Sequence, residues 1–192
     1  MSAPDAGRLI VISAPSGAGK TTIAREILRR NPSLAFSVSA TTRHRRDTEI
    51  DGEDYVFLEK DEFRRRVDAG EFVEWEEIYG EYYGTLRSAI DAALAEGKHL
   101  LFDVDVKGGL SIKRAYPQAL LIFIAPPSVE ELKQRLVARH TENAETLARR
   151  LARVPMEMSL GERFDHTVVN DDLATAIQEV QTLVSPFLFT RS

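Results

Sequence analysis

The chain has 192 residues, of which 43% are hydrophobic and 29% are charged, and it contains no cysteine. This composition favours one soluble globular unit and excludes disulfide frameworks, thiolate catalysis and cysteine-based zinc sites. The net charge of −5 argues against a general nucleic-acid-binding surface, and no apolar run is long enough to cross a membrane. Because residues 1–8 also lack the layout of a signal peptide, we expect a cytoplasmic protein without nucleic-acid or membrane partners.

Short apolar strands alternate with helical patterns along most of the chain. Residues 9–12 form a β-branched run typical of a strand buried on both faces, and residues 20–30 carry apolar side chains at helical spacing. Ser128 followed by Glu131 indicates a helix start, whereas Pro155 is expected to kink or interrupt its helix. In chain order, the patterns predict a strand at 9–12, a helix at 20–30, a strand at 34–38, a loop at 39–54, a strand at 55–58, a helix at 60–69, a strand at 72–78, a helix at 86–95, a strand at 99–104, a short helix at 109–115, a strand at 119–124, a helix at 128–139, an arginine-rich helix after a polar stretch at 140–145, a strand at 166–169 and a helix at 173–187.

This alternation predicts an α/β fold in which helices flank a parallel β-sheet. The segment from about residue 39 to residue 86 breaks the rhythm with short strands of its own. We interpret it as a small mixed α/β insertion mounted on the sheet. The chain shows no internal repeat, so we expect a single domain over residues 1–192.

The strongest signal is the segment Ala14-Pro-Ser-Gly-Ala-Gly-Lys-Thr21, which lies between the first strand and the first helix. It matches the phosphate-binding loop (P-loop) pattern, with alanine in place of the first glycine. The glycines let backbone N–H groups point at phosphates, and the following helix adds its positive dipole end. We therefore predict a P-loop NTPase-type core that binds ATP; a glycine-rich turn without a ligand is the alternative. The ATP-binding loop residues are Ala14, Pro15, Ser16, Gly17, Ala18, Gly19, Lys20 and Thr21.

Two of these residues have expected roles in the chemistry. Lys20 should reach the β- and γ-phosphates, and the Thr21 hydroxyl should ligate Mg²⁺. A carboxylate at the end of a neighbouring strand is expected to support the metal or its water molecules, and Asp103 occupies such a position. Asp105 lies two residues further on and could face the same site, although two surface aspartates at a strand end would show the same pattern.

Arginines gather in two places within this acidic sequence. The first group comprises Arg43, Arg45 and Arg46, and the second comprises Arg135, Arg139, Arg149, Arg150 and Arg153. In an acidic protein such groups favour discrete phosphate sites over an extended basic surface. Solvated loops and exposed helix faces are the alternative interpretation.

Taken together, these residues resemble the guanylate kinase family over nearly the whole chain. The resemblance rests on Ser37-Val-Ser-Ala-Thr-Thr-Arg43, Arg46, Asp51-Gly-Glu-Asp-Tyr55, Glu71-Phe-Val-Glu-Trp75, Tyr82-Tyr-Gly-Thr85, Asp103-Val-Asp105 and Val169-Asn-Asp-Asp172. It implies a kinase of purine nucleotide metabolism that uses ATP and Mg²⁺ to phosphorylate GMP, and also dGMP, by in-line phosphoryl transfer. The implied parts are a core (8–38, 98–138 and 160–192), a GMP-binding subdomain at about 39–97 and a lid at about 139–159.

The resemblance also assigns the grip on the GMP phosphate. Arg43 and Arg46 match the family's phosphate-binding arginines, whose planar guanidinium groups can bond two oxygens at once. Tyr55 and Tyr83 match tyrosines that donate hydroxyl hydrogen bonds to the same phosphate.

The guanosine end of GMP is assigned to a second set of residues. Glu74 matches the carboxylate that reads guanine, because a carboxylate accepts from guanine N1–H and the N2 amine side by side. Ser39 and Thr85 match small hydroxyl residues that complete guanine recognition, and Asp103 and Asp105 are placed on the acceptor side. We expect the neighbouring Trp75 to pack in the core instead of stacking on a base.

On the ATP side, Arg135, Arg139 and Arg150 match the lid arginines that surround the phosphates, and Asn170 matches a residue near adenine. We expect Lys20, Arg43, Arg139 and Arg150 to act catalytically. Three positions depart from the family pattern, namely His140 in place of a lid glycine, Pro155 in the late helix, and Arg45 where a proline is frequent.

Two other functions remain open at this stage. A kinase of the same fold could act on a different phosphorylated acceptor, and guanylate kinase-like domains that bind protein partners without catalysis also exist. Assembly into a homo-oligomer is also left open.

Overall fold

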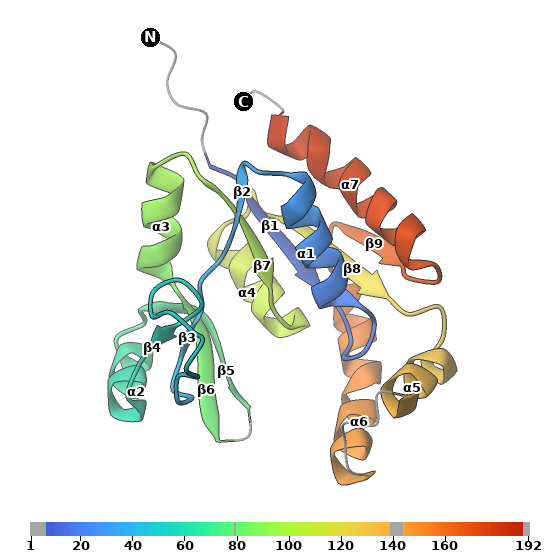
Figure 1. The fold of residues 1–192 in the computed structure, drawn as a ribbon, viewed down its shortest axis with the longest axis horizontal. Coiled ribbons are helices and arrows are strands. Elements are labelled where there is room, and N and C mark those ends of the chain that lie inside the picture. Colours follow the sequence, from blue (N-terminus) through green and yellow to red (C-terminus); the bar gives the residue numbers. More distant parts are fainter. Residues whose placement is uncertain (1–6, 79, 139–143, 190–192) are drawn as a thin grey trace.

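Figure 1 shows the computed structural model, which describes residues 7–78, 80–138 and 144–189. The strands are β1 (Leu9–Ser13), β2 (Leu34–Phe36), β3 (Ala40–Thr41), β4 (Val56–Phe57), β5 (Phe72–Ile78), β6 (Glu81–Leu86), β7 (His99–Asp103), β8 (Leu120–Ala125) and β9 (His166–Val169). The helices are α1 (Lys20–Arg30), α2 (Lys60–Asp68), α3 (Arg87–Ala95), α4 (Val106–Ala115), α5 (Val129–Ala138), α6 (Ala144–Gly161) and α7 (Leu173–Phe189).

Five parallel strands form the central sheet in the order β2-β7-β1-β8-β9. The central strand β1 pairs with β7 so that Ile12 lies opposite Asp103. Because the two strands run in the same direction, the carboxyl end of β7 lies beside the loop that follows β1. The predicted α/β class, with a parallel sheet flanked by helices, is confirmed.

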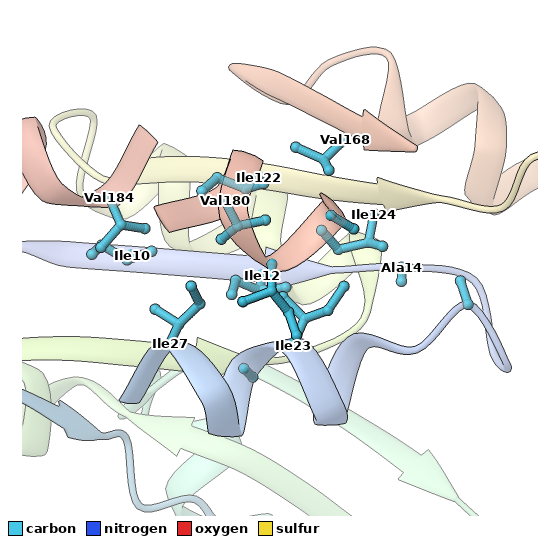
Figure 2. Packing of buried hydrophobic residues seen from close by; sticks show 14 of the residues in the cluster. Ile10, Ile12, Ala14, Ile23, Ile27, Ile122, Ile124, Val168, Val180 and Val184 are labelled. Carbon is cyan, nitrogen blue, oxygen red and sulfur yellow. The ribbon is translucent and has the colours of Figure 1, made fainter. Parts of the chain in front are cut away.

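The side chains of β1 alternate between the two faces of this sheet. Ile10 and Ile12 belong to one buried cluster with residues of α1 and α7, which Figure 2 shows from close by. Leu9 and Val11 belong to the other cluster, with residues of α3 and α4. The absence of alternation in this run follows from burial on both faces, and it places the end of β1 rigidly in the middle of the fold.

A second, mixed sheet in the order β4-β3-β6-β5 lies to one side of the central sheet, together with α2 (Figure 1). Its small core contains Ala40, Phe63, Phe72 and Leu86, and the rings of Phe63 and Phe72 stack with centroids 4.3 Å apart. This sheet lies within the predicted insertion.

The insertion holds two strands that the pattern did not predict. Strand β3 lies in the segment interpreted as loop, and β6 pairs antiparallel with both β3 and β5. A Cβ atom at Gly84 of β6 would lie 2.8 Å from the carbonyl oxygen of Glu74. The strands therefore approach too closely for a side chain, and the glycine weakened the β pattern of the sequence.

Three further expectations need correction. Helix α4 begins at Val106 instead of at residue 109, because the Asp105 side chain caps it by accepting from Gly108 N over 2.7 Å. Helix α6 continues through Pro155, so that residue does not interrupt it. Trp75 is 48% exposed, with its ring against Tyr82, and it is therefore not a core residue. The N-cap expected at Ser128 is present, since its hydroxyl accepts from Glu131 N.

Within the described residues, no helix combines the length and the apolar character needed to cross a membrane.

Candidate active site

The loop after β1 has the backbone shape that phosphate binding requires. Gly17 and Gly19 have φ values of 93° and 94°, which only glycine adopts easily. Helix α1 starts directly afterwards at Lys20, with no acidic residue in its first turn and no side-chain cap. Its positive dipole end therefore carries no counter-charge from its own first turn and is available to an anion.

Asn170 braces this loop from the far side. Its Nδ2 donates to the carbonyl oxygen of Ala18 over 2.7 Å, and a Cβ atom on Gly19 would collide with the same Nδ2. Asn170 is buried, and its contact with Ala18 places it directly beside the ATP-binding loop. Contact between Asn170 and adenine stays a prediction.

Asp103 holds both functional side chains at the start of α1. The ammonium group of Lys20 lies 2.7 Å from Asp103 Oδ1 and also donates to the carbonyl oxygen of Val104 over 2.9 Å. The Thr21 hydroxyl donates to Asp103 Oδ2 over 3.0 Å. The predicted carboxylate at the end of β7 thus lies beside the two side chains expected to touch phosphate and metal.

These oxygens fit a magnesium site of the P-loop kind. A hydroxyl and a nearby carboxylate are hard ligands, which Mg²⁺ combines with water and nucleotide phosphates. The part of the chain described by the structure contains no group of three or more histidine or acidic side chains able to hold a metal ion. Mg²⁺ bound mainly through nucleotide phosphates does not need such a group.

Asp105 has partners of its own, separate from those of Asp103. Its Oδ1 caps α4, and its Oδ2 lies 3.2 Å from Nη2 of Arg153. Asp103 and Asp105 each contact a side chain of the same cleft, since Lys20 and Arg153 both line it. That the two carboxylates serve one site stays a prediction.

Glu74 is a half-buried carboxylate of the insertion. It follows an irregularity in the pairing of β5 and β6, where Phe72 lies opposite Leu86 but Glu74 lies opposite Thr85. The fully buried Thr85 donates its hydroxyl hydrogen to Glu74 Oε1 over 2.5 Å. Burial, together with the charges of Asp105 and Glu76, raises the pKa of Glu74 to about 7.

An aromatic and cationic cluster lies in the same insertion. The Arg43 guanidinium lies over the Tyr55 ring at 5.3 Å, and the rings of Tyr55 and Tyr83 are 6.3 Å apart. Three of the four predicted phosphate-binding residues are therefore brought together. Arg46 contributes its backbone N–H to the same cluster, donating to Glu49 Oε2 over 2.8 Å, while its side chain is exposed.

Glu49, to which no role was assigned from the sequence, occupies the arginine fork in this structure. Its two oxygens accept from Arg43 Nη1 and Nη2 at 3.0 and 2.8 Å. Hydrogen bonds from the Arg43 side chain and the Arg46 backbone lower the pKa of Glu49 to about 2. The Arg43 fork thus holds two oxygens of one carboxylate, a bidentate geometry that is also open to a phosphate.

A cleft of about 490 Å³ separates the P-loop from the insertion and from α6. Arg150 projects from α6, and its Nη1 donates to Ser16 Oγ of the P-loop over 3.0 Å. Arg135 lies on α5 instead, where Nη1 donates to the carbonyl oxygen of Asn170 over 2.9 Å and Nη2 pairs with Glu131. Arg139 and His140 lie outside the described residues, so the role of Arg139 stays a prediction.

Five further charged residues line this cleft, and none was given an individual role from the sequence: Glu76, Glu77, Arg149, Arg153 and Glu157. Arg149, Arg153 and Glu157 are spaced four residues apart, which places them on one face of α6. This four-residue spacing, next to the predicted lid arginine Arg150, was the feature of the sequence that could have identified these residues. Ser39 lies just before β3, where its carbonyl oxygen accepts from Val56 N, and a contact between its hydroxyl and guanine stays a prediction.

The P-loop, with Lys20 and Thr21 held by the strand-end Asp103, and the arginine–tyrosine cluster of the insertion are the features of a P-loop phosphotransferase. A model of the guanylate kinase family matches residues 6–186. The chain is 51% identical to a guanylate kinase of Chlorobaculum tepidum over 185 residues, covering 96% of this chain and 95% of that one. It is 46% identical to a guanylate kinase of Symbiobacterium thermophilum over 178 residues, covering 93% of this chain and 84% of the relative.

A solved structure agrees with these sequence matches. The guanylate kinase from Anaplasma phagocytophilum superimposes with a TM-score of 0.72 at 28% identity, over 97% of this chain and 88% of that one. The chain belongs to the guanylate kinase family.

Proposed function

We propose that this enzyme transfers the γ-phosphoryl group of ATP to GMP, and to dGMP, forming ADP and the nucleoside diphosphate. The observation that carries the assignment is the hydrogen-bonded pair of the half-buried Glu74 and the buried Thr85. Guanine presents two adjacent donors, N1–H and the N2 amine, which suit an acceptor-only carboxylate. Adenine presents no such pair, so Glu74 favours guanine over the other common bases.

The phosphate of GMP is proposed to bind at Arg43, Tyr55 and Tyr83. The fork of Arg43 already holds two carboxylate oxygens in this structure. A phosphate would take those two hydrogen bonds and add tyrosine hydroxyl donors. Arg46 would contribute its side chain from the exposed loop.

The ATP phosphates are proposed to bind the P-loop backbone and the start of α1. Lys20 would exchange its bonds with Asp103 and Val104 for phosphate oxygens, and Arg150 would turn from Ser16 toward the transferred group. Mg²⁺, when bound near Thr21 and Asp103, would neutralise phosphate charge. Positioning and charge neutralisation then supply the catalysis, and the acceptor oxygen needs no strong general base because it belongs to a phosphate.

The division into moving parts is also a proposal. We place the GMP-binding subdomain at about residues 39–97 and the lid at about 139–159, on a core of residues 8–38, 98–138 and 160–192. The cleft bordered by Glu76 of β5, the P-loop and Arg150 of α6 lies where these parts would approach one another. Their closure would exclude water and protect ATP from hydrolysis.

A panel of acceptors tests the assignment. ADP release is measured with GMP, dGMP, AMP, CMP and UMP at equal concentrations, with MgATP in excess. We expect rapid release with GMP and dGMP only. Equal turnover of AMP and GMP would instead indicate a kinase with another acceptor, and no release with any acceptor would indicate a non-catalytic binding module.

A further inference from the structure

Arg153 of α6 is bonded to three carboxylates that come from three parts of the fold. Its Nη1 lies 2.9 Å from Glu76 Oε1 of β5, and its Nη2 lies 3.2 Å from Asp105 Oδ2 at the start of α4. Its Nε lies 3.3 Å from Glu157 Oε1, one turn further along its own helix. A single guanidinium thus joins the insertion, the central core and the late helix.

Arg153 is bonded to an acidic cluster in a cleft that Lys20 also lines. Burial and the charge of Asp105 raise the pKa of Glu76, and Arg153 opposes that rise. Burial likewise raises the pKa of Glu157, with Asp105 adding to the rise and Arg153 and Lys20 opposing it. Arg153 therefore offsets the mutual repulsion of the carboxylates that lie around its guanidinium group.

Asp105 in turn lies next to the guanine-reading carboxylate. A Cβ atom at Gly108 would lie 3.1 Å from Glu74 Oε2 and 3.2 Å from Asp105 Oδ1, so both oxygens border the same small space. Gly108 N fixes Oδ1 of Asp105, and Arg153 fixes Oδ2. The orientation of Asp105 beside Glu74 depends on both contacts.

We propose that Arg153 is a positioning residue for the acceptor nucleoside, which holds Asp105 in its orientation beside Glu74 and ties Glu76 of the insertion to α6. The inference rests on the proposed function, because it concerns the pocket assigned to guanosine. Arg153 does not touch the reacting atoms in this account. Its removal therefore changes the binding of GMP and leaves the phosphoryl transfer step in place.

If the role of Arg153 were purely structural, its replacement would mainly lower the thermal midpoint of unfolding. The Arg153 side chain is 43% exposed, and ion pairs of such exposure add little to stability because water screens them. We therefore expect the thermal midpoint of unfolding to move little when Arg153 is replaced.

The test compares Arg153→Met and Arg153→Lys with the unmodified enzyme, using Arg163→Met as a matched control. Arg163 is exposed, follows the end of α6 and does not line the cleft. For Arg153→Met we expect the KM for GMP to rise about tenfold, with kcat and the KM for ATP within about twofold. The lysine variant, which keeps the charge but loses the fork, should recover part of this loss.

Two results would overturn the inference. Unchanged kinetics in Arg153→Met would make the ion pairs incidental, and a fall in kcat with an unchanged KM for GMP would place Arg153 at the transferred phosphoryl group. Both are distinct from failure of the proposed function, in which the unmodified enzyme itself would not phosphorylate GMP.

Discussion

Thr85 donates its hydroxyl hydrogen to Oε1 of Glu74 over 2.5 Å, and Oε2 of the same carboxylate borders the space above Gly108. One oxygen is thus anchored within the sheet while the other faces Asp105. The irregular pairing that precedes Glu74 in β5 brings it opposite Thr85. The backbone of the insertion therefore sets the direction in which the carboxylate points.

The first prediction concerns pH. Burial raises the pKa of Glu74 from 4.5 to about 7, so the group is largely protonated below that pH and ionised above it. Only the ionised form accepts two hydrogen bonds from guanine. The KM for GMP should therefore fall as the pH rises through about 7, while the KM for ATP changes less. A KM for GMP that is constant across this range would contradict the assignment.

The raised pKa has a matching effect on stability. A carboxyl whose pKa is higher in the folded state binds its proton more tightly there than in the unfolded chain. The contribution of Glu74 to stability is thus complete below 4.5 and is lost as the pH rises toward about 7. The variant Glu74→Gln cannot titrate, so urea unfolding at several pH values should show a smaller loss in the variant than in the unmodified enzyme.

A second prediction uses the same variant to test base selection. Glu74→Gln replaces one acceptor oxygen by a donor, which opposes a guanine donor. The preference for GMP over AMP in kcat/KM should drop by about 10- to 100-fold, corresponding to about 1–3 kcal/mol. Glu96→Gln, an exposed change at the end of α3, serves as the control and should leave the preference intact.

The third prediction concerns Lys20. In Lys20→Ala, kcat should fall by about 10²- to 10³-fold with GMP and dGMP alike, because a positive charge aimed at the phosphates is lost. Isothermal titration of GMP into the ATP-free variant should give an unchanged affinity, since the proposed GMP site is formed by other residues. A selective rise in the KM for GMP would show that Lys20 contributes to the binding of GMP and would contradict its assignment to the ATP phosphates.

The fourth prediction separates packing from backbone strain in the P-loop. Gly19→Ala forces a side chain into the left-handed region at φ 94° and against Asn170. Gly70→Ala has a similar φ of 70° but meets nothing within 4 Å. Urea unfolding should show a loss of about 1–2 kcal/mol for Gly70→Ala and a clearly larger one for Gly19→Ala. Equal losses would show that Asn170 does not brace the loop.

The parts of the site nearest the central sheet could be predicted from the sequence because their signals are local. A strand buried on both faces, a glycine-rich turn and a Gly-Lys-Thr helix start follow one another without interruption. Asp103 is recognised equally locally, because it ends another apolar strand, β7, which pairs with β1. Their contacts agree with that interpretation, since Asp103 joins Lys20 and Thr21.

The insertion was harder to predict because its strands are short and paired across distant residues. Strand β6 escaped recognition because Gly84 is required by a close approach of β5, and Trp75 proved exposed because its strand lies at the edge of the small sheet. Glu49 and Arg153 could be interpreted only once their partners were located, because Glu49 pairs with Arg43 within a loop and Arg153 pairs with the distant Glu76. The four-residue spacing of Arg153 and Glu157 indicated only that they share a helix face.

A crystal structure of the enzyme with bound GMP would show whether Glu74 reads guanine and Arg43 binds the phosphate. We expect guanine N1 and N2 within about 3 Å of the Glu74 carboxylate, with the phosphate in the fork of Arg43 and Glu49 displaced from it. Guanine bound away from Glu74, with the Arg43–Glu49 pair still intact, would contradict both assignments.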